Sequence, residues 1–131
     1  MDSKTLDELF LKTRHLYVKL AEFEDITLEL AQAVDRRDEV SVQMLLNMRE
    51  DPANQLQEIN SGLRARLMEL PEEEAIRARE LLEGAPQAAP EEERICAQIS
   101  QNMRLLRRCQ DLDRRISTRI DGKRSFYNKF R

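Results

Sequence analysis

The sequence predicts an all-α protein, an elongated antiparallel bundle of three long helices with a short connector helix. Two features of its composition point to long helices: 36% of its 131 residues are charged, and it holds only three glycines and four prolines. Glycine and proline disfavour helix interiors, so a chain with few of them has few breaks. The third observation is an apolar spacing of three and four residues that persists over long segments.

The first helix is expected over residues 4–35. Its apolar positions step by three and four residues without interruption, which keeps one face apolar for about four heptads. Phe10, Tyr17 and Ala31 lie one position beyond this stripe and widen it, a pattern that suits packing against two neighbouring helices. The stripe consists of Leu6, Leu9, Thr13, Leu16, Leu20, Phe23, Thr27, Leu30 and Val34.

The segment "VDRRDEV" predicts a tight reversal into a second helix over residues 39–69. Asp35 or Asp38 can cap this helix through its carboxylate. Pro52, which lacks an amide hydrogen, and the turn-like "INSGL" leave open whether the helix is continuous. Its inner side is predicted to consist of Val42, Leu45, Leu56, Ile59, Leu63 and Leu70, with Met44 and Met48 beside them.

The connector helix is expected over residues 72–83, because Pro71 opens it, three glutamates follow and Gly84 ends it. After the loop "APQAAP", a second "PEEE" begins the last long helix, over residues 91–121. Asn102 lies near the stripe of this helix, where a single polar residue often fixes the register. The last helix is predicted to bury Ile95, Ile99, Met103, Leu106, Cys109, Leu112, Ile116 and Ile120.

The sequence carries no recognisable catalytic, cofactor or metal site, so we expect neither enzyme activity nor a bound cofactor. His15, the only histidine, lies beside the apolar stripe and is expected to be solvated. Glycine-rich phosphate loops, nucleophile elbows and zinc-ligand spacings do not occur. Cys96 and Cys109 would lie about 20 Å apart along one helix, too far to pair or share a metal.

Two further patterns predict a soluble, cytoplasmic protein. No apolar run approaches the roughly 18 residues of a membrane span, and the acidic start "MDSKTLDELF" does not resemble a secretory signal. Localisation in the cytoplasm is therefore the expectation.

Charge is distributed unevenly along the chain. Residues 1–93 hold 11 basic and 22 acidic side chains, whereas residues 94–131 hold 11 basic and three acidic ones. Two interpretations are open. The basic stripe of the last helix could follow nucleic-acid phosphates, or it could be a solvated face whose edges pair with acidic neighbouring helices, which the net charge of −3 favours. This stripe contains Arg104, Arg107, Arg108, Arg114 and Arg115.

Residues 122–131 are predicted to form a flexible aromatic-basic tail outside a helical bundle of residues 1–121. Asp121 and Gly122 provide a helix stop. The tail has half of the aromatic residues of the chain. These side chains either pack over the end of the bundle or order when a partner binds, and both alternatives are open.

The helix "LYVKLAEFEDITLELAQAV", the corner "DRRDEV", the segments "SVQMLLNMRE" and "ISQNMRLLRRCQDL", and the aromatic-basic tail together resemble the flagellar export chaperones of the FlgN type. The resemblance implies a small cytoplasmic bundle that binds helical C-terminal segments of hook-filament junction proteins for type III export. Pro52 and the connector helix depart from the family pattern. The resemblance implies that the partner-binding residues are Leu105, Leu112, Ile116, Phe126, Tyr127 and Phe130.

Two other functions are consistent with the same residues. A structural coiled-coil scaffold could use the stripe of the first helix to form a homodimer. A nucleic-acid-associated protein could use the basic last helix. The sequence alone does not decide whether the protein is a monomer or a homodimer. It also does not identify the partner protein.

Overall fold

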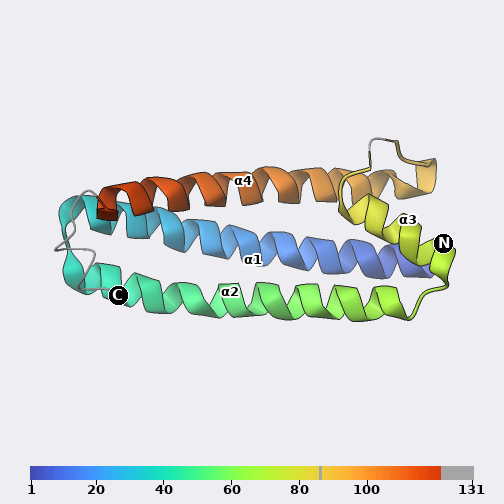
Figure 1. Cartoon of the computed structure of the whole chain (residues 1–131), viewed down its shortest axis with the longest axis horizontal. Coiled ribbons are helices and arrows are strands. Elements are labelled where there is room, and N and C mark those ends of the chain that lie inside the picture. Colours follow the sequence, from blue (N-terminus) through green and yellow to red (C-terminus); the bar gives the residue numbers. More distant parts are fainter. Residues whose placement is uncertain (86, 122–131) are drawn as a thin grey trace.

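The computed structural model describes residues 1–85 and 87–121, and all regular structure in this part of the chain is helical (Figure 1). The predicted all-α bundle is therefore confirmed. A single 3₁₀ turn precedes the last helix. The elements are α1 (Ser3–Arg36), α2 (Glu39–Met68), α3 (Glu72–Leu82), the 3₁₀ turn η1 (Pro90–Glu92) and α4 (Glu93–Asp121).

The helix α1 lies in the middle, with α2 along one side and α4 along the other (Figure 1). The direction of α2 is antiparallel to α1, whereas α4 runs parallel to α1. Extensive contact joins α1 to both neighbours, but the described parts of α2 and α4 do not pack extensively against each other. The long helices therefore form one elongated layer, and the short α3 lies across one end of it.

The corner between α1 and α2 is built without glycine. Arg37 adopts a left-handed backbone with φ of 57°, and its amide donates to the Val34 carbonyl at 3.1 Å. Asp38 then caps α2, because its Oδ1 accepts from the Ser41 amide at 3.1 Å and its Oδ2 accepts from Ser41 Oγ at 2.6 Å. Of the two predicted caps, Asp38 is the one used.

The helix α2 is continuous through both of the positions that left its course open. Pro52 is buried inside it, and Gly62 lies within its second half. A Cβ atom at Gly62 would stand 3.9 Å from Lys12 Nζ, an ordinary contact. Neither residue ends the helix, because the packing of α2 along α1 holds the backbone in place.

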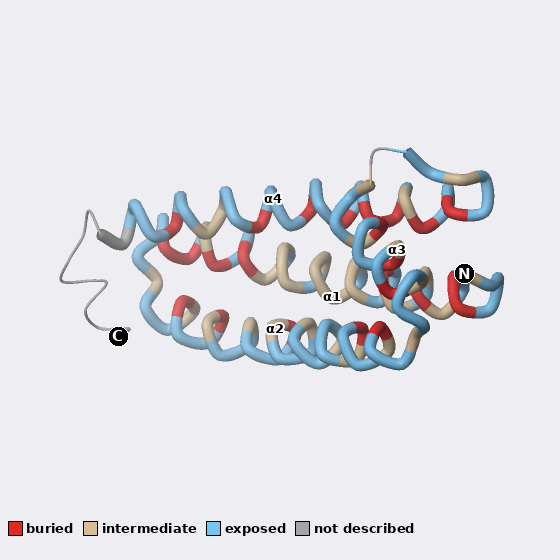
Figure 2. The backbone as a smooth tube through the Cα atoms, turned by 45° about the vertical axis from the view of Figure 1, so that its right-hand side comes forward, coloured by how far each residue is buried: buried red, intermediate tan, exposed pale blue. Residues whose placement is uncertain are grey.

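The core consists of two apolar clusters, one at each end of the layer (Figure 2). The stripe of α1 is buried in both clusters, as predicted, but Leu16, Leu20 and Phe23 between them are only half-buried. The cluster beneath α3 contains Leu6, Leu9, Leu63, Leu67, Ala78, Leu81, Ile95 and Ile99. The cluster at the corner contains Leu30, Ala33, Val34, Val42, Leu45 and Ile116.

The inner face of α4 differs from the prediction. Met103 and Leu106 were expected to be buried, but they are 43% and 45% exposed. Leu105, which is 1% exposed, takes the core position, with Gln98 and Asn102 buried beside it. The buried face shifts only around these positions, because hydrogen bonds allow the two polar residues to face α1. The other predicted core residues Ile95, Ile99, Cys109 and Ile116 are buried, as predicted.

The remaining burial predictions have mixed outcomes. Met44 and Met48 of α2 are exposed, and Leu67 is a core residue that the predicted stripe omitted. Leu112 is half-buried, and the side chain of Ile120 lies outside the described part of the chain. His15 is exposed, as predicted.

Candidate functional site

An open apolar groove with a cavity volume of about 440 Å³ lies between α2 and α4, over the middle of α1. Its floor is made by Thr13, Leu16 and Leu20 of α1. The groove exists because α2 and α4 each pack on α1 and leave the centre of its stripe uncovered. Its walls are Leu56, Asn60, Leu63, Arg64 and Leu67 of α2, and Ile99, Asn102, Met103 and Leu106 of α4.

The helix α3 closes one end of this groove, where Leu82 belongs to the lining. Leu63 and Ile99 line the groove and also belong to the core cluster beneath α3. The groove and the site occupied by α3 are thus consecutive parts of one furrow. The chain leaves the furrow at Gly84, whose φ is 91° and where a Cβ atom would stand only 3.2 Å from Met103 Sδ.

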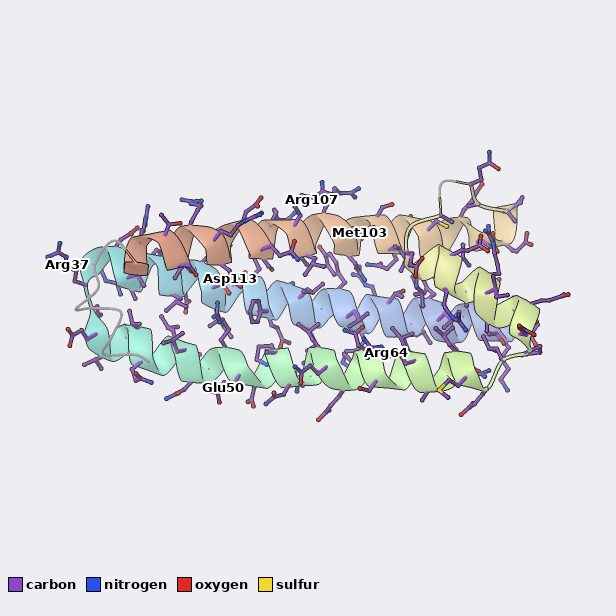
Figure 3. All side chains as sticks on the ribbon, viewed as in Figure 1. Arg37, Glu50, Arg64, Met103, Arg107 and Asp113 are labelled. Carbon is purple, nitrogen blue, oxygen red and sulfur yellow. The ribbon has the colours of Figure 1, made fainter. Side chains whose placement is uncertain are left out.

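An ion pair marks the other end of the groove. Arg49 Nη1 of α2 donates to Asp113 Oδ1 of α4 at 2.7 Å, and so joins the two helices across α1. The same guanidinium lies 5.0 Å from the ring centroid of Phe23 and 3.5 Å from Thr27 Oγ1. Figure 3 places Asp113 further along α4 than Met103, toward the corner.

A chain of hydrogen bonds runs through the wall between α1 and α4. Gln98 Nε2 donates to Asn102 Oδ1 at 2.9 Å, and Asn102 Nδ2 donates to the Thr13 carbonyl at 2.8 Å. Arg14 Nη1 donates to Gln98 Oε1 at 3.4 Å. The Thr13 hydroxyl donates to the Phe10 carbonyl at 2.8 Å. The polar side chains in this chain of hydrogen bonds therefore find their partners within the bundle.

Arg64 is different from these polar residues. It is exposed at the rim of the groove, and it forms no hydrogen bond or ion pair with any other described residue. Arg64 and Met103, both labelled in Figure 3, come from α2 and α4 on opposite sides of the groove. The groove therefore offers an apolar surface with one cationic group at its edge.

Ion pairs with α1 account for part of the basic stripe of α4. Arg94 lies 3.7 Å from Asp7, and Arg108 Nε donates to Glu24 Oε2 at 2.8 Å. Further pairs join Arg119 to Asp35 and Arg114 to Asp111. Of the stripe itself, Arg108 pairs with α1 and Arg114 with its own helix. The other three stripe residues, Arg104, Arg107 and Arg115, form no ion pair with a described residue, so pairing accounts for only part of the stripe.

A partly buried ion pair holds α3 against η1. Arg77 of α3 donates from Nη2 and Nε to Glu92 at 2.6 and 3.0 Å, and Glu92 also accepts from the Ala89 amide. The Arg77 guanidinium holds the pKa of the Glu92 carboxyl below its ordinary value. This anchor ties α3 to the beginning of α4.

Neither cysteine is suited to chemistry. Both are free thiols. Burial raises the pKa of Cys109 to about 11, and burial also raises the pKa of Cys96. Both thiols therefore stay protonated at neutral pH. Within residues 1–85 and 87–121, no group of histidine, cysteine, aspartate or glutamate side chains could hold a metal ion.

The groove does not consist of the residues that the resemblance implied. Leu105 and Ile116 are core residues, and Leu112 is half-buried outside the groove. Phe126, Tyr127 and Phe130 lie outside the described residues. The one feature of the sequence that indicates the groove is the widened apolar stripe of the first helix. A wide stripe suits a neighbouring helix on each side, and two such neighbours leave the centre of the stripe open.

Comparison with known proteins finds no matching family model, no matching curated protein and no matching solved structure. Among the described residues, no helix has the length and apolar character needed to cross a membrane. The resemblance to the FlgN-type chaperones therefore rests on the sequence pattern alone.

Proposed function

We propose that this protein is a non-enzymatic chaperone that binds an amphipathic helical segment of a partner protein in the groove between α2 and α4. The open groove is the observation that carries the proposal. Leu16 and Leu20 on its floor are only half-buried, and Met103 and Leu106 on its wall are exposed. Such contiguous apolar surface commonly marks a site of protein contact.

A helix is the occupant that fits the surroundings of the groove. The furrow already holds the helix α3 at one end, so the spacing between α2 and α4 admits a helix. A further helix would cover the centre of the α1 stripe, as each helix in a bundle covers its neighbours. Along α2 the lining runs from Leu56 to Leu67, a rise of about 16 Å, which is room for about three helical turns.

The resemblance gives this proposal its specific form. The partner is then the helical C-terminal segment of a hook-filament junction protein, bound in the cytoplasm before type III export. Amphipathic helices bind apolar grooves through side chains that recur every three to four residues. The groove supports helix binding, while the flagellar assignment comes from the sequence pattern.

The test measures the affinity of the full chain for labelled peptides that span the C-terminal helices of hook-filament junction proteins from the same genome. Met103→Glu places a carboxylate on the apolar wall, and we expect it to weaken binding at least about tenfold. Met44→Glu is the matched control, because Met44 is 53% exposed on α2 and lies outside the groove. Fluorescence anisotropy gives the affinities, and circular dichroism checks that both variants are folded.

Three results would contradict the proposal. Equal affinity of the Met103→Glu and Met44→Glu variants would remove the groove from binding. A homodimer that Met103→Glu converts to a monomer, measured by light scattering, would make a second copy the occupant. Absence of binding to every junction-protein peptide would refute the export role.

A further inference from the structure

Among the described residues that line the groove, Arg64 is the only ionisable one. Its guanidinium has no partner among the described residues, although arginine has five N–H donors to satisfy. The other polar lining residues are Thr13, Asn60 and Asn102, which are neutral. An occupant of the groove therefore meets a single positive charge, on the α2 side.

The helix α3 is an example of what the furrow accepts. Its buried face consists of Ala75, Ala78 and Leu81, so small residues bring its backbone close to the furrow. Arg77 of α3 pairs with Glu92 of η1, away from this face. A helix face of small and leucine side chains is thus what this end of the furrow already binds.

Building on the proposed function, we infer that the partner helix lies next to α3, in the groove between α2 and α4, and carries an acidic side chain that pairs with Arg64. It spans the groove between Leu82 and the Arg49–Asp113 pair. It presents small and leucine-type side chains to Leu16 and Leu20, as α3 presents its own to the neighbouring part of the furrow.

The charge of the occupant also separates this partner from the tail of the chain. Residues 122–131 hold four basic side chains and no acidic one. A basic segment in the groove would meet Arg64 as a like charge, which disfavours it. An acidic partner helix is the occupant that the charge of the groove selects.

The experiment uses the full chain and two stapled peptides. One has the sequence of residues 71–84, "PEEEAIRARELLEG", and the other has lysine in place of each glutamate. The staple keeps the peptides helical, because isolated helices of this length are marginal in water. We expect the acidic peptide to bind more tightly, and Arg64→Glu to weaken it about three- to tenfold while strengthening the lysine peptide. These differences should shrink at high salt.

Arg104→Glu is the matched control, because Arg104 is an exposed arginine of α4 outside the groove and without a partner in the described part of the chain. Equal effects of Arg64→Glu and Arg104→Glu would overturn the inference. So would equal binding of the two peptides to the unmodified protein. If Met103→Glu still weakens the junction-protein peptides in that case, the proposed function stands and only the acidic pairing falls.

Discussion

Replacing Asn102 by leucine tests how much the hydrogen bonds between α1 and α4 stabilise the fold. Asn102 is 9% exposed, and Gln98, which donates to it, is 5% exposed. Asn102→Leu removes two hydrogen bonds, each worth about 0.5–1.5 kcal/mol, and leaves the Gln98 amide without its partner at a cost of about 1–3 kcal/mol. After the gain from burying leucine, we expect the free energy of unfolding to fall by about 2–3 kcal/mol.

The double variant Gln98→Leu with Asn102→Leu provides the control. It removes donor and acceptor together, so its stability should lie within about 1 kcal/mol of the unmodified protein. Arg14, which donates to Gln98, is exposed and can turn to water. Urea unfolding followed by far-UV circular dichroism gives the free energies, and light scattering shows whether the mass changes. This reasoning would be refuted if Asn102→Leu were as stable as the unmodified protein. It would also be refuted if the double variant had a lower free energy of unfolding than Asn102→Leu.

Two predictions concern the anchoring of α3. The lowered pKa of Glu92 means that its pair with Arg77 stabilises the fold above about pH 4.5 and that this contribution is lost as the pH falls through the lower folded pKa. The Glu92→Gln variant should therefore lose less stability on acidification than the unmodified protein does. Urea midpoints at several pH values measure this loss, and the same pH dependence in both proteins would contradict a stabilising role of the pair. Leu81→Ala should lower the free energy of unfolding by about 2–5 kcal/mol, because Leu81 is fully buried. Ile76→Ala, on the exposed side of α3, should lower it far less. Thermal unfolding measures both losses. Equal losses would contradict the packing of α3.

The fold could be predicted from the sequence where apolar spacing and local hydrogen bonds determine the structure. The stripe of α1 identified four core residues of this helix, Leu6 and Leu9 in one cluster and Leu30 and Val34 in the other. Asp38 was one of the two candidate caps. Asn102 was placed near the buried stripe of α4, but the burial of Gln98 was missed because Gln98 is polar. Their burial depends on the Thr13 carbonyl and Arg14, which lie far away in the chain.

The groove could not be predicted for a different reason. Leu16, Leu20 and Leu56 have the same spacing as residues of the closed core, so the sequence does not distinguish them. Whether they are covered depends on the distance between α2 and α4, which in the described part of the chain both pack on α1 and only weakly on each other. The candidate site is therefore a property of the helix arrangement, and no single motif encodes it.

The central place of α1 also bears on the order of folding. The contact of α1 with α2 passes through the tight corner at Arg37, whereas the pairs that hold α4 join residues 84 positions apart, as Arg108 and Glu24 are. Closing a long loop is slower than closing a hairpin, so we expect α1 and α2 to pair first and α4 to dock afterwards. Since α4 forms one wall of the groove, a newly made chain gains its binding surface only in the final step of folding.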